Sequence, residues 1–268
     1  MEHQQNQREW AGYGQTDPGL VRTTNQDSFL VDNRRRLWAV ADGMGGHPGG
    51  EVASRLVVDI LADFAPTLCR SIDSAHNHAE QQGRFLLTTM AEQAHTAVRS
   101  HAERNRAVYG MGTTLVMAHL LPLSHPRLLV LNVGDSRAYL IRADTIIQLT
   151  RDHTLLEDSI RDGRLTPVQA AHHPDRHVLT RAMGVGPTLE SDLFSSDLQN
   201  GDLLLLCSDG LTTMLTDEEI LNTVRPRLHD AHDSTQALIR AAIERGGIDN
   251  VTVVTCSVVD TRKQTNRH

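Results

Sequence analysis

Short apolar runs rich in β-branched residues and longer amphipathic stretches follow one another along the chain, and they predict strands and helices respectively. The predicted strands are 28–31, 37–41, 128–133, 138–142, 145–149, 203–207 and 251–259. The predicted helices are 51–64, 85–106, 217–224 and 234–245. Because these elements come in blocks and do not alternate strictly, we expect an α+β fold with antiparallel sheets rather than a doubly wound parallel sheet.

Residues 151–190 differ from the rest of the chain because they are polar and rich in histidine and arginine. Short helical patterns occur in them at 155–161 and 167–171. We interpret this segment as a mobile excursion packed on the edge of a single domain that covers residues 10–260. The polar ends, 1–9 and 261–268, are predicted to be tails.

The amino-acid composition excludes several classes of function for this chain. A chain of 268 residues with 39% apolar residues can bury a large core without disulfides. Its formal net charge of −7 disfavours a nucleic-acid binder, and its longest apolar runs are too short to span a bilayer. Three scattered cysteines without a CxxC pair fit the reducing cytoplasm. We therefore expect a cytoplasmic globular protein.

Aspartates fall at the ends of the predicted strands. Asp42, Asp135 and Asp209 each follow an apolar run, whereas Asp27 and Asp249 stand just before one. In an antiparallel sheet the end of one strand lies beside the start of its neighbour. The five acids could therefore converge on one edge.

One of these pairings can be checked by counting residues. If 27–42 forms a hairpin whose turn is centred near Arg34 and Arg35, residue 27 pairs with residue 42. Asp27 and Asp42 would then lie side by side at the open end of the hairpin.

Carboxylates gathered at one edge repel one another unless cations neutralise them. Oxygen ligands without cysteine suit Mg²⁺ or Mn²⁺ better than Zn²⁺. A binuclear site of this kind can activate a water and clamp a phosphoryl group, and Arg22 could bind the phosphate through its planar guanidinium. The competing interpretation is that each Asp-Gly pair is only a turn and that Arg22 is a surface charge. Five acids in equivalent positions favour the metal site.

Six motifs in a fixed order make the chain recognisable. They are Gly19-Leu20-Val21-Arg22-Thr23-Thr24-Asn25-Gln26-Asp27, Ala41-Asp42-Gly43-Met44-Gly45-Gly46-His47, Gly112-Thr113-Thr114, Gly134-Asp135-Ser136-Arg137, Ser208-Asp209-Gly210-Leu211 and Asp249-Asn250-Val251-Thr252. The chain resembles the metal-dependent Ser/Thr protein phosphatases, the protein phosphatase 2C family, in its short bacterial form. This resemblance implies a β-sandwich of two antiparallel sheets flanked by helix pairs, with the metals at one end.

The resemblance also assigns metal ligands. Asp42 would bridge two tightly bound metals, and Gly43 would offer its backbone carbonyl. Asp209 and Asp249 would hold one of these metals, and Asp27 would hold the waters of the other. The metals would be Mn²⁺ or Mg²⁺.

The remaining roles are implied in the same way. Arg22 would bind the substrate phosphate, so that Arg22, Asp42 and Asp209 are the expected catalytic residues. Asp135 would support a third, weaker metal together with Asp209. Residues 151–190, with Arg181-Ala182-Met183-Gly184, look like the flap of the family.

The general acid is a departure from many eukaryotic members of the family, which have a histidine directly after the Asp-Gly. Here that position is Met44, as is usual in the bacterial branch, and His47 lies three residues further on. His47 is a possible general acid, and a water bound to metal is the alternative.

Other chemistry fits the sequence less well. Cys256 and Arg262 have the spacing of cysteine-dependent phosphatases, but they lack the glycines that would cradle a phosphate. The glycines between Gly43 and Gly50 are not followed by Gly-Lys-Ser/Thr, so a nucleotide loop is not expected.

We therefore expect a phosphatase that hydrolyses phosphoserine and phosphothreonine in proteins, by direct attack of an activated water and without a phosphoenzyme. Its expected partners are phosphorylated proteins and a Ser/Thr kinase whose action it reverses. We expect a monomer that neither binds nucleic acid nor spans a membrane. The alternative is a catalytically silent regulatory or binding module on the same fold.

Overall fold

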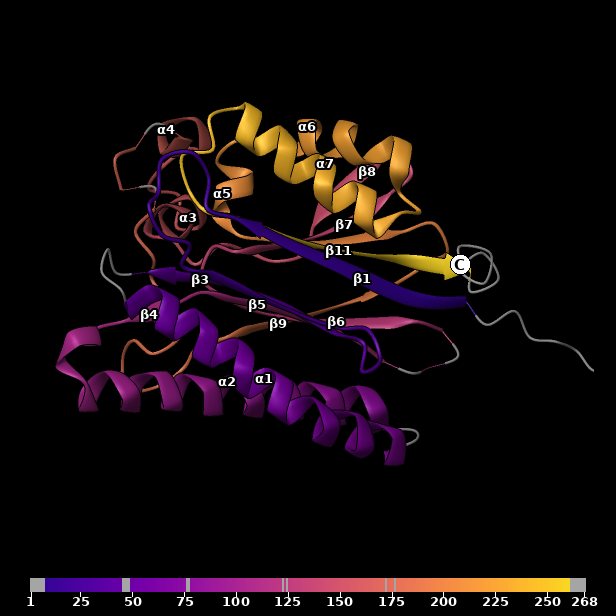
Figure 1. Ribbon diagram of the computed structural model, residues 1–268, viewed down its shortest axis with the longest axis horizontal. Coiled ribbons are helices and arrows are strands. Elements are labelled where there is room, and N and C mark those ends of the chain that lie inside the picture. The colour runs from indigo at the N-terminus through magenta and orange to yellow at the C-terminus, as the bar shows by residue number, and fades with distance from the viewer. Residues whose placement is uncertain are drawn as a thin grey trace, which may run out of the picture.

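The computed structural model places two antiparallel sheets face to face, with helices on both outer surfaces (Figure 1). It describes residues 8–44, 49–75, 78–121, 123, 125–171, 173–175 and 177–260. Residues 1–7 and 261–268 of the predicted tails lie outside this description. The predicted α+β sandwich is confirmed.

The first sheet has the strand order β1-β11-β10-β7-β8. Its strands are β1 (Arg8–Asp17), β7 (Arg137–Arg142), β8 (Thr145–Gln148), β10 (Leu203–Cys207) and β11 (Val251–Asp260). The second sheet has the order β2-β3-β5-β6-β9, and β4 pairs with β3. Its strands are β2 (Asp27–Asp32), β3 (Leu37–Met44), β4 (Gly112–Thr113), β5 (Leu115–Leu121), β6 (Arg127–Val133) and β9 (Asp192–Asp197).

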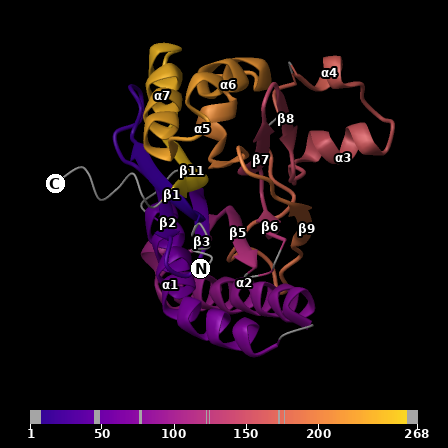
Figure 2. The ribbon, with the colours of Figure 1, turned by 90° about the vertical axis from the view of Figure 1, so that its right-hand side faces the viewer.

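Helices complete the layers on either side of the sandwich (Figure 2). The helices α1 (Gly49–Ser74) and α2 (Ala79–Arg104) cover the second sheet. The first sheet is covered by α5 (Asp209–Thr212), α6 (Asp217–Val224) and α7 (Ala231–Glu244). Within the described residues, no helix is both long enough and apolar enough to cross a membrane.

Three apolar layers hold these parts together. The middle layer lies between the sheets and includes Trp38, Val130 and Leu204. The outer layers pack the second sheet on α1 and α2, and the first sheet on α6 and α7. Side chains of central strands therefore meet apolar neighbours on both faces, which explains why β10 reads as an unbroken apolar run.

All the predicted strands and helices are present, although several are longer than expected. The helix predicted at 51–64 continues through Pro66 to Ser74. Burial of Leu68 and Ile72 in the core stabilises the additional turns. Strands β1, β4, β5 and β9 and the short helix α5 were not predicted. In the excursion, α3 (Leu155–Arg161) and α4 (Pro167–Ala171) have the predicted bounds, and in Figure 2 they project beside β8.

Strand register brings the aspartates to one end of the sandwich. Asp27 pairs with Asp42 in the β2–β3 hairpin, as the residue count predicted. Cys207 pairs with Val253, so the chain that leaves β10 into Asp209 lies beside the chain that enters β11 from Asp249. Leu115 pairs with Val133, which brings the start of β5 next to the turn that carries Asp135.

Candidate active site

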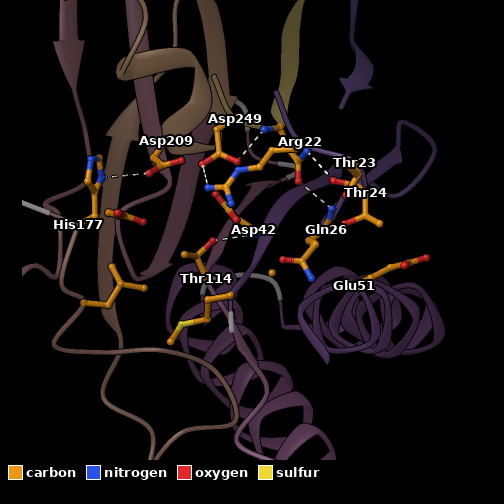
Figure 3. Close-up of a pocket in the computed structure, with 15 residues that line it drawn as sticks. Arg22, Thr23, Thr24, Gln26, Asp42, Glu51, Thr114, His177, Asp209 and Asp249 are labelled. Carbon is orange, nitrogen blue, oxygen red and sulfur yellow. Dashed lines mark hydrogen bonds and ion pairs between the residues drawn. The ribbon is translucent and has the colours of Figure 1, made fainter. Parts of the chain in front are cut away.

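An open cavity of about 590 Å³ lies where these strand ends meet (Figure 3). Four of the predicted acids line it, namely Asp42, Asp135, Asp209 and Asp249, together with Arg22 at its rim. Each comes from a different loop or strand end, so the sandwich alone brings them together.

Asp27 lies behind this cavity and joins the two sheets. It belongs to β2, yet its Oδ2 accepts hydrogen bonds from Ser208 Oγ at 2.8 Å and Thr252 Oγ1 at 2.6 Å, both from the other sheet's side. Its Oδ1 is buried and has no hydrogen-bond partner within the described chain. Burial raises the pKa of Asp27 to about 6, against the effect of the two hydroxyls, and the charge of Asp209 adds to the rise.

Two further acids of the site, Asp42 and Asp135, also have raised pKa values. The pKa of Asp42 is raised well above its usual value by burial and then by the charges of Asp27, Asp209, Asp135 and Asp249. Burial and the charge of Asp209 raise the pKa of Asp135 to about 7. The charges of the other four acids all act on Asp42, which is the physical sign that the five share one site.

Divalent cations fit this site. Its donors are carboxylate and carbonyl oxygens, which suit Mg²⁺ and Mn²⁺, and cations would relieve the repulsion that raises the pKa values. The buried, unpaired Oδ1 of Asp27 is a further oxygen that a hydrated cation could satisfy. The predicted ligands Asp42, Gly43, Asp209 and Asp249 all reach the cavity.

The backbone around Gly43 is packed too closely for any side chain. A Cβ atom there would lie 2.2 Å from the carbonyl oxygen of Gly50 and 2.6 Å from that of Gln26. This close approach places the first turn of α1 against the end of β3. The lack of space for a side chain therefore explains the Asp-Gly pair better than a turn does, because Gly43 lies within β3.

Thr114 holds the backbone of Asp42 in place, although we had given it no role. Its Oγ1 accepts from the backbone N–H of Asp42 at 3.0 Å, and its own N–H donates to the Asp42 carbonyl at 2.8 Å. Thr113 Oγ1 donates to the same carbonyl. The Gly112-Thr113-Thr114 motif was the available signal for this contact.

His153 holds the turn that carries Asp135. Its backbone N–H donates to the Gly134 carbonyl at 3.0 Å, and its Nδ1 accepts from the Gly134 N–H at 3.1 Å. Gly134 has φ of 103°, which a side chain would strain. Since His153 opens the 151–190 segment, the base of the excursion is bonded directly to the Asp135 turn.

Asn250 tethers the loop that carries Arg22. Its Oδ1 accepts from the Gln26 N–H at 2.9 Å, and its Nδ2 donates to the carbonyls of Pro18 and Thr24. The Asp249-Asn250-Val251-Thr252 motif was the available signal, although it assigned no role to this asparagine. It fixes the Arg22 loop beside Asp249.

Arg22 pairs with a carboxylate at the cavity mouth. Its Nη2 lies 2.7 Å from Asp249 Oδ2, and its side chain is 56% exposed. The hydrogen bond and charge of Asp249 raise the pKa of Arg22 further. In Figure 3 the guanidinium extends between Asp249 and Asp42, in the wall of the cavity that a phosphate could enter.

The excursion adds His177 to the cavity. Its Nδ1 lies 3.6 Å from Asp209 Oδ2, and no motif had pointed to it (Figure 3). Met44 lines the cavity at the position where a histidine stands in many eukaryotic relatives. His47, the possible general acid, lies outside the described residues.

Comparison with known proteins agrees with this geometry. Residues 21–244 match the family described as Protein phosphatase 2C. The serine/threonine protein phosphatase PstP of Mycobacterium tuberculosis is 38% identical over 91% of this chain, which spans 44% of PstP. The serine/threonine phosphatase stp of Listeria innocua is 37% identical over 89% of this chain and 92% of its own length.

The chain belongs to the protein phosphatase 2C family. Among solved structures of the protein phosphatase 2C fold, the catalytic domain of PstP in complex with two manganese ions is 35% identical, with a TM-score of 0.76. The match covers 94% of this chain and all of that domain, 100%. The family and the fold that the motifs indicated are therefore confirmed, and the relatives named above are serine/threonine phosphatases.

The repulsion within this protein phosphatase 2C site leads to a prediction about the metal-free protein. An acid whose pKa is raised on folding binds its proton more tightly in the folded state, so its contribution to stability is lost as pH rises through the folded pKa. In EDTA, we expect Asp42→Asn to increase the free energy of unfolding at pH 8, because one repelling charge is removed. The increase should shrink as pH falls toward about 5, where the wild-type acids become protonated.

Urea denaturation at several pH values measures this effect. Asp63→Asn, at an exposed position of α1, is the matched control and should show little change at any pH. An Asp42→Asn effect that is equal at pH 5 and pH 8 would contradict the assignment. With Mn²⁺ present, Asp42→Asn should be less stable than the wild type, since the variant has lost a ligand for the cation.

Proposed function

We propose that this chain removes phosphate from phosphoserine and phosphothreonine in proteins, using Mn²⁺ or Mg²⁺ to activate a water for direct in-line attack. The observation that carries the proposal is the set of five mutually repelling carboxylates at an open cavity with an arginine at its rim. The cavity is open enough for a phosphorylated side chain to enter while the rest of the substrate stays outside.

Divalent cations bound at this site would neutralise the acids, lower the pKa of a coordinated water and polarise the phosphoryl oxygens. Asp42, Asp209, Asp249 and the Gly43 carbonyl would hold two of them. Asp27, which is buried behind the cavity, would act through their waters. Asp135, with Asp209, would hold a third, weaker cation.

The chain's own residues do the rest. Arg22 would turn its guanidinium fork toward two phosphate oxygens, which orients the phosphorus above the acids and meets charge that grows in the transition state. Because the Arg22 loop is tethered through Asn250, little ordering is needed when the phosphate arrives. With Met44 in place of a histidine, the proton for the departing alkoxide would come from His47 or from a coordinated water.

The partners we propose are phosphorylated proteins and a Ser/Thr kinase whose products this chain reverses. We further propose that it acts in the cytoplasm as a monomer. The competing proposal, a silent binding module, would require at least one ligand to be lost or turned away. Four of the acids line the cavity and the fifth lies behind it, which favours a catalytic phosphatase over the silent module.

The experiment that tests this function uses purified chain with p-nitrophenyl phosphate and a phosphothreonine peptide. We expect hydrolysis of both with Mn²⁺ or Mg²⁺ and none in excess EDTA, because the nucleophile depends on the cations. Readdition of Mn²⁺ should restore turnover. Full activity in EDTA would exclude the proposed chemistry, and no activity with any divalent cation would favour the silent module.

For Arg22 we expect a loss of substrate binding. Arg22→Ala should raise the KM for the phosphopeptide by about tenfold or more, since a charged hydrogen-bonding group is worth about 1.5–3 kcal/mol. The KM of Arg22→Lys should lie between those of Arg22→Ala and the wild type, because lysine keeps the positive charge but lacks the planar guanidinium group. Arg104→Ala, at an exposed position of α2, is the control. A large loss of Mn²⁺ affinity by calorimetry, with unchanged KM, would instead place Arg22 in support of Asp249.

Substitution of Asp135 should affect turnover without the loss of metal binding expected for the other acids. We expect Asp135→Ala to bind two Mn²⁺ with near-native affinity, yet to turn over phosphopeptide about tenfold more slowly or worse, about 1.4 kcal/mol of lost transition-state stabilisation. Additional Mn²⁺ should not restore the rate, because the ligand itself is missing. Wild-type turnover would show that Asp135 is only a turn residue held by His153.

A further inference from the structure

A second cavity, of about 410 Å³, lies at the opposite end of the β2–β3 hairpin from the catalytic acids. The hairpin turn forms one wall, the C-terminal half of α1 forms another, and His119 of β5 completes it. The six residues of β2 separate it from Asp42's end of the hairpin by roughly 17 Å. It is therefore distinct from the active site and is used by no step of the proposed reaction.

Arginines dominate the lining of this cavity. Arg34, Arg35 and Arg36 follow one another in the turn, and Arg70 faces them from α1. Arg35 is paired with Asp32 at 2.7 Å, whereas Arg34, Arg36 and Arg70 form no ion pair with any described residue. Asp73 is the one acid among the lining residues. On a chain whose net charge is −7, such a concentration of positive charge marks a binding site for an anion.

The turn that carries these arginines is held rigidly. The Arg36 carbonyl accepts both the Leu120 N–H and the His119 Nδ1–H, each at 3.1 Å, and the Cys69 thiol lies 3.4 Å from the Arg35 carbonyl. Arg36 has φ of 54°, a conformation that residues other than glycine adopt rarely. The backbone that carries these arginines is therefore already ordered before an anion binds, which lowers the entropic cost of binding.

His119 supplies an unsatisfied acceptor in the cavity wall. It is 2% exposed, and burial lowers its pKa to about 4, so the ring is neutral near pH 7. Because Nδ1 donates to the Arg36 carbonyl, Nε2 is the acceptor, and Nε2 has no partner within the described structure. A buried acceptor without a partner is energetically unfavourable. Nε2 is itself closed to solvent, so a hydroxyl or N–H of a bound ligand would satisfy it only by moving the cavity wall aside.

We propose that this arginine cavity, lined by Arg34, Arg36, Arg70 and His119, binds a small ligand that carries a phosphate group and a hydroxyl. The guanidinium groups would hold the phosphate oxygens, and the hydroxyl would serve the His119 side of the cavity. Its volume lies within the range of pockets for small molecules and exceeds what a bare phosphate fills, which favours a phosphorylated sugar or nucleoside over orthophosphate. This inference does not depend on the phosphatase activity.

Titration calorimetry on the full chain tests the proposal. The probes are ribose 5-phosphate, adenosine 5′-monophosphate, orthophosphate and a phosphoserine peptide. Measurements are made first in EDTA, where the catalytic end offers mainly repelling carboxylates to an anion, and then with Mn²⁺. We expect the sugar phosphate or the nucleotide to bind in both conditions. The same heat with orthophosphate alone would assign the site to free phosphate, which shares the proposed chemistry.

Variants locate the binding. Arg34→Ala/Arg70→Ala removes two exposed guanidinium groups of the cavity and should weaken binding by about tenfold or more, about 1.4 kcal/mol. The matched control Arg104→Ala/Arg240→Ala removes two exposed arginines from α2 and α7 and should leave binding unchanged. Turnover of p-nitrophenyl phosphate with Mn²⁺ should be that of the wild type in both double variants. The proposal is overturned if no probe binds, if only the peptide binds, or if both double variants weaken binding equally.

Discussion

The buried carboxylate of Asp27 is the constraint on which the active end of this molecule depends. It belongs to one sheet and accepts hydroxyl hydrogen bonds from Ser208 and Thr252, which come from the other. Those two residues stand next to the chain segments that carry Asp209 and Asp249. A single hydrogen-bonded acid therefore sets the separation of the sheets at the point where the other acids must converge.

This arrangement has an electrostatic cost that the fold must offset. Burial, and then the charges of neighbouring acids, raise the pKa values of Asp27, Asp42 and Asp135, so the metal-free site opposes folding near neutral pH. The apolar layers on either side of both sheets supply the compensating stability. The same repulsion is what gives the site its affinity for cations, so stability is given up locally in exchange for function.

Much of the site could be predicted from the sequence, because it depends on strand ends and those are local features. Counting residues placed Asp27 opposite Asp42 correctly, since a short polar turn leaves the register little freedom. The supporting contacts of Thr114, His153 and Asn250 could not be found in this way. Each is a hydrogen bond between segments far apart in the chain, and only the tertiary structure selects one polar residue over its neighbours.

The missed strands have physical causes too. Strand β1 contains two glycines and few apolar residues, and it exists because it pairs along its whole length with β11. Strand β5 is built from leucine, methionine, alanine and histidine as well as valine, so its local propensity does not favour a strand. Burial between two layers decides its conformation.

The pairing of β1 with β11 also determines when the molecule can be completed during synthesis. Arg8 is opposite Asp260 and Asp17 is opposite Val251, so the first described strand pairs with the last described strand. Thr252, which donates a hydrogen bond to Asp27, lies in β11, and Asp249 lies just before it, so both are synthesised together with this strand. Contacts of such long sequence separation form slowly. The nascent chain must therefore carry an open sandwich, with an unpaired β1 and an unassembled cation site, until β11 has been synthesised.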